Sequence, residues 1–264
     1  MANRMDDLGG VYAKLHRARV HSGELAQAEA EFRLTSPWTV AEAIEDDWHI
    51  FHAIIMRPAP LSLSVIMGEA IHQMRSSLDH LATAAARLCD STARDIHFPF
   101  KERPALFDEW KKKNASHIRA DHMDVIERHQ PFATKAEPHE LLRAMAEFDN
   151  EAKHAVVPPA YAFMPVYGFM GDAEVEFLHP ENVENGTLLC RCRPAPGARV
   201  VGTLDIELAY GEPRGLIRQS TLMAMEYQVG MVVADVRAVT PEWNVVPPPR
   251  PAPEPELRQP DQAQ

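Results

Sequence analysis

The sequence predicts an α+β protein, with a core of about four long helices and a small antiparallel sheet. Apolar residues recur at helical spacing over several long segments without proline, and they alternate with polar residues in shorter segments between turn signals. Of the 264 residues, 45% are hydrophobic and 25% are charged. These proportions are typical of a globular chain that buries a sizeable core.

The N-terminal third contains the clearest elements. Apolar residues at helical intervals predict a helix over residues 8–33, which a Ser-Pro pair at 36–37 ends. Alternation over residues 38–57 predicts a β-hairpin with an Asp-Asp turn at 46–47. The strongest pattern covers residues 64–89, where the apolar side chains form one continuous stripe. This segment is expected to be a buried core helix.

The rest of the chain alternates between weaker helices and strands. Helices are predicted over residues 104–115, 117–129, 138–154 and 216–238, and strands over residues 173–178, 187–193 and 199–210. An Asn-Gly pair at 185–186 is a turn signal. From Thr240 onward, eight prolines fall within 25 residues, and such a segment buries too little apolar surface to offset its ordering entropy. We therefore expect one domain over residues 1–239 and a disordered tail over residues 240–264.

Composition restricts the partners. Subtracting 38 acidic from 27 basic residues gives a net charge of −11, which disfavours an extended nucleic-acid footprint because phosphate neutralisation needs a basic surface. The N-terminus has no apolar signal-peptide core, and no apolar run approaches the roughly 18 residues of a membrane span. Three cysteines make no disulfide framework. We expect a cytoplasmic protein with no membrane association.

The helix predicted over residues 64–89 also has a polar face. Helical geometry of about 100° per residue places six chemically versatile side chains between about 100° and 240° from Met74, the centre of the apolar stripe: Arg75, Asp79, His72, Ser76, Glu69 and His80. An imidazole can act as a general acid or base, and a guanidinium can hold a phosphate. Two interpretations stay open: these groups meet another element and build a site, or they form a solvated or structural face with an Arg75–Asp79 ion pair.

A second polar cluster lies at the end of the 138–154 helix. Asp149 and Lys153 are four residues apart, as are Asn150 and His154, and cations are favoured at a helix C-terminus. A structural cap explains this cluster without any site. Alternatively, Asn150, Lys153 and His154 bind a substrate, in which case the cluster is expected to point at the polar face of the 64–89 helix.

The segment HQMRSSLDHLA at residues 72–82 resembles the helix of a widespread family of uncharacterised bacterial and phage proteins. That family typically reads G-(D/E)-x-(L/I)-H-N-L-R-S-A-L-D-H-L-A, with Gln73 here replacing the usual Asn. Its Q-P-(Y/F) element is matched at residues 130–132, and its N-x-x-K-H-R element is matched over residues 150–155 except for Ala155 at the last position. The resemblance implies no settled activity.

The spacing from Arg75 to His80 is similar to the R-x(4–6)-H signature of the HEPN superfamily, with Ser76 where Asn is frequent. This resemblance implies a helical bundle that dimerises and brings two Arg–His pairs together in a cleft. It also implies metal-independent cleavage of RNA through attack of a 2′-hydroxyl on the adjacent phosphate, in a toxin or phage-defence setting. In that mechanism His80 is the acid–base group and Arg75 holds the phosphate.

Other motifs favour structural roles. Strand alternation puts Cys190 and Cys192 on one face, as expected for buried structural cysteines. His117, Asp121 and His122 are too few to complete a metal site, and no nucleotide-binding motif is present, so we expect neither metal nor cofactor. The alternative to a ribonuclease is a non-catalytic interaction module that uses the polar face as a dimer or partner interface. The candidate catalytic residues are Arg75, His80, His72 and Asp79, and the candidate substrate-binding residues are Lys153, His154 and Asn150.

Overall fold

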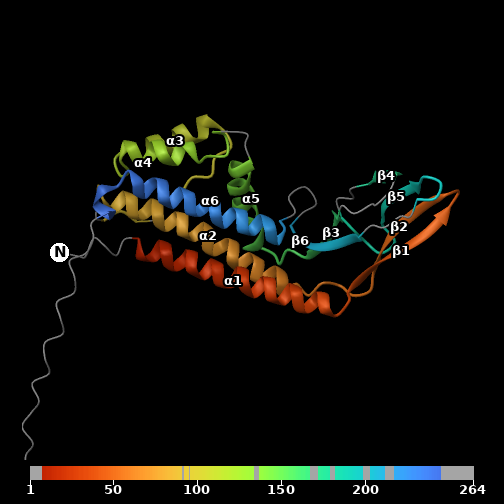
Figure 1. Cartoon of the computed structure of the whole chain (residues 1–264). Helices are drawn as coiled ribbons and strands as arrows, with labels where there is room; N and C mark the ends of the chain where they lie inside the picture. Colours follow the sequence, from red (N-terminus) through yellow and green to blue (C-terminus); the bar gives the residue numbers. More distant parts are fainter. Residues whose placement is uncertain are drawn as a thin grey trace, which may run out of the picture.

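The computed structural model contains mainly helices together with small antiparallel sheets, which confirms the α+β class. It describes residues 8–90, 92–94, 96–133, 137–166, 172–178, 182–198, 203–211 and 217–244. Three long helices lie side by side (Figure 1): α1 (Gly9–Leu34), α2 (Leu61–Arg87) and α6 (Gln219–Ala238). The shorter helices α3 (Pro104–Asn114), α4 (Ala120–Arg128) and α5 (Glu137–Ala152) follow α2 in the chain, and both α4 and α5 pack against α6.

Helix α2 is the centre of the core, as its apolar stripe predicts. The side chains of that stripe are buried against α1, α5 and α6: Met67, Ala70, Ile71, Met74, Leu78, Leu81 and Ala85. Burial of each large side chain contributes about 1.5–3 kcal/mol. The opposite face of α2 meets α5 in its N-terminal half, and this contact creates the site described below.

Two small antiparallel sheets lie at one end of the long helices (Figure 1). The first contains β1 (Trp38–Glu45), β2 (Trp48–Ile55), β4 (Ala173–Phe177) and β5 (Leu188–Pro194) in the order β1-β2-β5-β4. Asp46 and Asp47 both have positive φ, 49° and 67°, which a two-residue hairpin turn requires. The second sheet pairs β3 (Pro159–Val166) with β6 (Thr203–Tyr210).

Strand β3 is a departure from the sequence prediction, which ended a helix at residue 154 and placed the next strand at residues 173–178. Pro159 and Pro165 lie within this strand, opposite Tyr210 and Leu204. Proline cannot donate to a sheet ladder, but a two-stranded sheet leaves one edge of each strand unpaired, so the missing donors are tolerated. The predicted start of β6, over residues 199–202, lies outside the described residues.

The ordered domain extends further than the predicted boundary at residue 239. Thr240 is fully buried, and Pro241–Trp243 form a 3-10 helix that packs on α6. The prediction of tail from residue 240 was therefore wrong for residues 240–244, and residues 245–264 lie outside the described chain. Within the described residues, the helices are too short or too polar to cross a membrane.

Candidate functional site

The polar face of α2 and the cluster at the end of α5 meet at Asp149. The Nδ1–H of His72, from the middle of α2, donates to Asp149 Oδ1 (2.9 Å), and Lys153 Nζ donates to Asp149 Oδ2 (2.6 Å). The Asp149 side chain is 1% exposed, whereas those of His72 and Lys153 are 50% and 46% exposed. One buried carboxylate therefore holds two accessible nitrogen groups from two elements. The expectation that the two polar segments converge is confirmed for this pair.

The bond to Asp149 fixes the chemistry of His72. An ionised carboxylate only accepts hydrogen bonds, so the imidazole nitrogen facing it carries the proton. In the neutral ring, Nε2 is then unprotonated and has a free lone pair. His72 is therefore positioned and polarised as a general base.

An open cavity of ≈ 410 Å³ adjoins these groups. His72, Asp149 and Lys153 line one part of it, together with Glu69, whose carboxylate lies 3.5 Å from Nδ1 of His21. The remaining wall is mainly apolar and comes from the first turns of α2, the last turn of α5 and the segment after it: Val65, Gly68, Ala152, Ala155, Val156 and Val157. The volume is that of a small-molecule site.

Asp79 does not take part in this arrangement. Its Oδ1 accepts the backbone N–H of Phe98 (2.8 Å), and its Oδ2 lies 3.3 Å from Nδ1 of His97. The predicted Arg75–Asp79 pair is present at 3.8 Å, and the Arg75 guanidinium stacks over Phe100 at 4.0 Å. These contacts fasten the segment after α2 onto the helix. The predicted catalytic role of Asp79 beside His72 is replaced by this structural one.

Arg75 and His80 lie on different faces of α2. Arg75 contacts Phe100, whereas a Cβ added to Gly10 of α1 would come within 2.6 Å of Nδ1 of His80. Five helical residues turn the chain by about 500°, which leaves the two side chains about 140° apart. Within one chain, the Arg–His pair of the R-x4-H pattern is therefore not assembled.

The other two residues of the predicted substrate-binding set also lie apart from His72. Asn150 lines a different cavity, of ≈ 380 Å³, that includes Arg75 and Arg143. His154 is exposed beyond the end of α5. Of the three, only Lys153 reaches the site.

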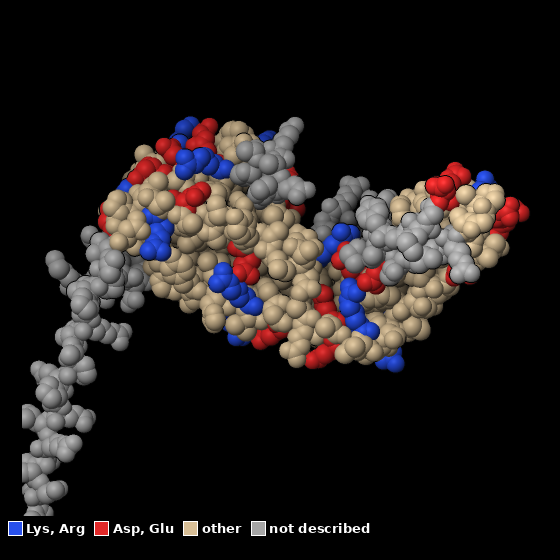
Figure 2. All heavy atoms as spheres, in the orientation of Figure 1, with Lys and Arg blue, Asp and Glu red and all other residues tan. Residues whose placement is uncertain are grey.

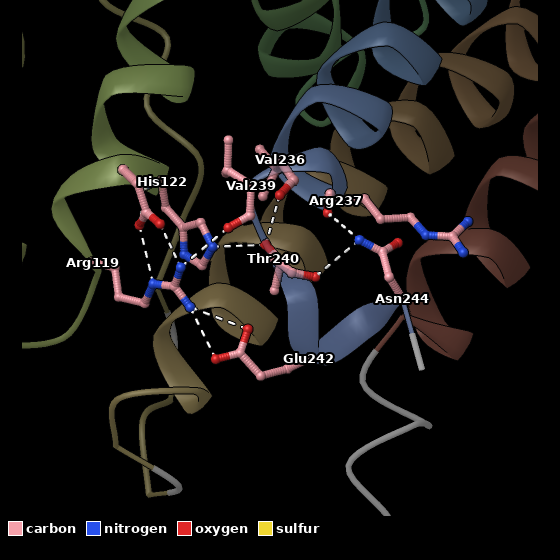
Figure 3. A network of polar contacts seen from close by, with 9 residues as sticks. Arg119, His122, Val236, Arg237, Val239, Thr240, Glu242 and Asn244 are labelled. Carbon is pink, nitrogen blue, oxygen red and sulfur yellow. Dashed lines mark hydrogen bonds and ion pairs between the residues drawn. The ribbon is translucent and has the colours of Figure 1, made fainter. Parts of the chain in front are cut away.

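The residues considered for metal binding, His117, Asp121 and His122, have separate structural partners. In Figure 3, His122 Nε2 meets Thr240 Oγ1 (2.8 Å), and Arg119 binds Glu242 (3.0 Å) and the carbonyl of Val239 (3.1 Å). Since Thr240 Oγ1 donates to the Val236 carbonyl (2.6 Å), it must accept from His122 Nε2–H. Burial lowers the pKa of His122. This network fastens the end of α6 to α4.

Metal ligation finds no support in the described part of the chain, where no three His, Cys, Asp or Glu side chains form a group that fits an ion. His117 lies 3.7 Å from Asp90, and Asp121 is bonded to Arg119. Cys190 and Cys192 are buried free thiols, as predicted. Burial raises the pKa of Cys190 to about 12 and that of Cys192 in the same direction, so both are protonated at neutral pH.

Comparisons with known proteins leave the geometry as the basis for assigning function. No protein-family model matches the chain, and neither a curated protein nor a solved structure matches it.

The sequence predicted His72 and Lys153 as site residues but missed Asp149 as the residue that joins them. Its signal was the four-residue spacing to Lys153, which indicated an ion pair without indicating burial. The cavity of ≈ 570 Å³ between β2 and β3 is larger, but its described lining has no histidine and no cysteine. The His72 cavity is therefore the better candidate for proton-transfer chemistry.

Proposed function

We propose that this protein is an enzyme in which His72 acts as general base on a small substrate held between α2 and α5. The observation that supports this proposal is the buried Asp149 carboxylate. It orients the imidazole of His72 through one oxygen and the ammonium group of Lys153 through the other. A base and a cation fixed on one support are the groups needed to activate a hydroxyl and to stabilise the negative charge that develops at its target.

The reaction class is addition of water or of a substrate hydroxyl to a carbonyl or phosphoryl centre. His72 Nε2 takes the proton while the oxygen bonds to that centre, and Lys153 N–H groups stabilise the charge on the oxygen of the centre. When the bond to the leaving oxygen breaks, His72 returns the proton to it. Hydrolysis thus consumes one water and restores the neutral imidazole. Asp149 stays ionised and stabilises the intermediate imidazolium.

Cleavage of RNA is the second candidate, because attack of a 2′-hydroxyl on phosphate is the phosphoryl case of the same chemistry. In this arrangement His72 takes the role expected of His80, and Lys153 takes that of Arg75. The surroundings favour a small substrate over a polyanion: the chain has a net charge of −11, and Glu69 lines the cavity. On the face in Figure 2, the coloured Lys and Arg side chains are scattered among Asp and Glu without a continuous basic band.

A non-catalytic interaction module is the alternative function, and one observation favours it. Met223, Tyr227 and Met231 are exposed at intervals of four residues on α6. This uncharged strip suits contact with a second copy of the chain, since two chains of net charge −11 repel each other wherever charged faces meet. Sedimentation velocity of the wild type and of Tyr227→Glu tests it. A dimer of the wild type that is lost in the variant supports the interaction-module function. A monomeric wild type contradicts homodimerisation through this strip.

The catalytic proposal is tested with a panel of 4-nitrophenyl acetate, 4-nitrophenyl phosphodiesters and a fluorogenic RNA. The matched variants are His72→Gln and His80→Gln, because both histidines are exposed on α2. General-base catalysis contributes about 10²–10⁴-fold, so His72→Gln is expected to lose at least about 100-fold of the turnover that His80→Gln retains. Equal activity in the two variants, or no turnover of any substrate by the wild type, contradicts the proposal. Turnover of RNA alone selects the second candidate.

A further inference from the structure

Ser64 is an unexplained buried group in the same cavity. It lies two helical turns before His72 on α2, and it is one of the residues that line the cavity. The residue is only 4% exposed, and its hydroxyl has no hydrogen-bond partner within the described chain. A buried polar group without a partner destabilises the folded protein. A ligand that bonds to this hydroxyl removes that cost.

The distance between Ser64 and His72 sets the length of such a ligand. Eight residues of α-helix rise by about 12 Å, so the hydroxyl and the imidazole mark two ends of an elongated site. Leu61, Val65, Gly68 and His72 follow one another at four-, three- and four-residue intervals, which places them on one face of α2. Leu61 and Val65 are both exposed large apolar side chains on this face.

The opposite wall is apolar as well. Ala152 closes α5, and Val156, which follows it, is exposed although large and apolar. A Cβ added to Gly68 would lie 3.5 Å from the Ala152 Cβ, with no other neighbour closer than 4 Å. The missing side chain lets α2 and α5 approach closely at this point, while Val65 and Val156 line the open part of the same cavity. Exposed apolar side chains gathered at a cavity are typical of a ligand-binding groove.

We infer that the cavity binds a linear acyl compound. Its carboxyl or ester group lies at His72 and Lys153, its methylene chain lies between Val65 and Val156, and an oxygen at its far end bonds to Ser64. This inference rests on the proposed function for the reacting end, and it adds the substrate class. The three parts of the ligand correspond to the three parts of the wall: a base with a cation, an apolar passage, and a single hydroxyl.

The test is isothermal titration calorimetry of the full chain with hexanoate, octanoate, decanoate and 10-hydroxydecanoate. Each buried methylene contributes about 0.8 kcal/mol, so affinity is expected to rise about three- to fourfold per methylene. The 10-hydroxyl group is expected to add at least about threefold in the wild type and nothing in Ser64→Ala. Gly68→Leu is expected to abolish the dependence on chain length, whereas Leu61→Ala, at the edge of the site, is expected to reduce it only partly.

Two results overturn the inference: affinity that does not change with chain length, or a 10-hydroxyl advantage that persists in Ser64→Ala. The His72→Gln variant separates this inference from the proposed function. Acyl binding that persists in wild type and variant without hydrolysis of any ester leaves the ligand class standing and removes the catalytic proposal. His72-dependent hydrolysis of 4-nitrophenyl acetate, together with acyl affinity that does not depend on chain length, supports the catalytic proposal and overturns the inferred ligand class.

Discussion

At the scale of single residues, Asp149 decides what the neighbouring groups do. A buried carboxylate is costly unless it is paired, and Asp149 has both oxygens paired while its partners stay accessible. This asymmetry distinguishes it from Asp79, whose oxygens face a backbone N–H and two side chains that fasten a segment of chain. The two aspartates stand in similar sequence patterns, each four residues from a cation. Only their surroundings distinguish Asp149, which belongs to the candidate site, from Asp79, which holds a chain segment in place.

His122 gives a prediction at the same scale. Burial lowers the pKa of this histidine in the folded protein below the value of about 6.5 in the unfolded chain. At a pH between these two pKa values, the unfolded chain binds more protons than the folded protein. Its contribution to stability is therefore complete above about pH 6.5 and is lost as the pH falls. The slope is at most about 1.4 kcal/mol per pH unit. Arg119, Asp121 and Glu242 face the same network, but the pKa values of these two acids are lowered, so they titrate below this range.

Urea unfolding at pH 7.0, 6.0 and 5.0 measures the effect. The wild type is expected to lose more stability across this range than His122→Gln, while His16→Gln, at an exposed position of α1, is expected to behave as the wild type. Parallel curves for the wild type and His122→Gln contradict the account of this network.

At the scale of elements, the polar side of α2 meets three different neighbours along its length. Its first half meets α5 at His72, its middle fastens the following segment through Arg75 and Asp79, and His80 lies against Gly10 of α1. The helix itself was predictable, because its apolar stripe has helical periodicity. The division of its polar face among three neighbours was not, since periodicity gives the direction of a side chain but not what packs there.

Replacement of Asp79 tests the middle contact. Asp79→Ala leaves the Phe98 N–H without its acceptor beside a buried ring, at an expected cost of about 1–3 kcal/mol in the free energy of unfolding. Hydrogen exchange of the Phe98 amide is expected to accelerate. Asp124→Ala serves as the control, since that carboxylate is exposed on α4 and its expected cost is within about 0.5 kcal/mol. Similar costs for the two variants contradict the structural role of Asp79.

At the scale of the whole molecule, the fold class, the hairpin and the helices followed from periodicity and turn signals. Strand β3 did not, because its two prolines argue locally against a strand and only the pairing with β6 explains it. The end of the domain was also missed. Proline content predicts a tail, whereas the burial of Thr240 and the stacking of Trp243 on His122 depend on the distant helix α4.

Two truncations test that boundary. Removal of residues 241–264 deletes Glu242 and Trp243, which contact Arg119 and His122. Removal of residues 245–264 spares both. The longer deletion is expected to lower the thermal midpoint by several degrees, since about 1 kcal/mol corresponds to roughly 2–4 °C in a domain of this size. The shorter deletion is expected to leave the midpoint unchanged. Equal midpoints for the two truncated chains contradict the assigned boundary.

The most direct test of the site measures the reactivity of His72 without any substrate. Diethyl pyrocarbonate modifies unprotonated imidazole nitrogens, so the reaction is run at about pH 8.5, well above the usual imidazole pKa of about 6.5. Peptide mass spectrometry gives the rate at each histidine. If Asp149 polarises His72, this residue reacts at least about threefold faster than His80 in the wild type, and Asp149→Ala removes the difference while the rate at His80 stays the same. Equal rates at His72 and His80 in the wild type, or an unchanged His72 rate in Asp149→Ala, contradict a general base at this position.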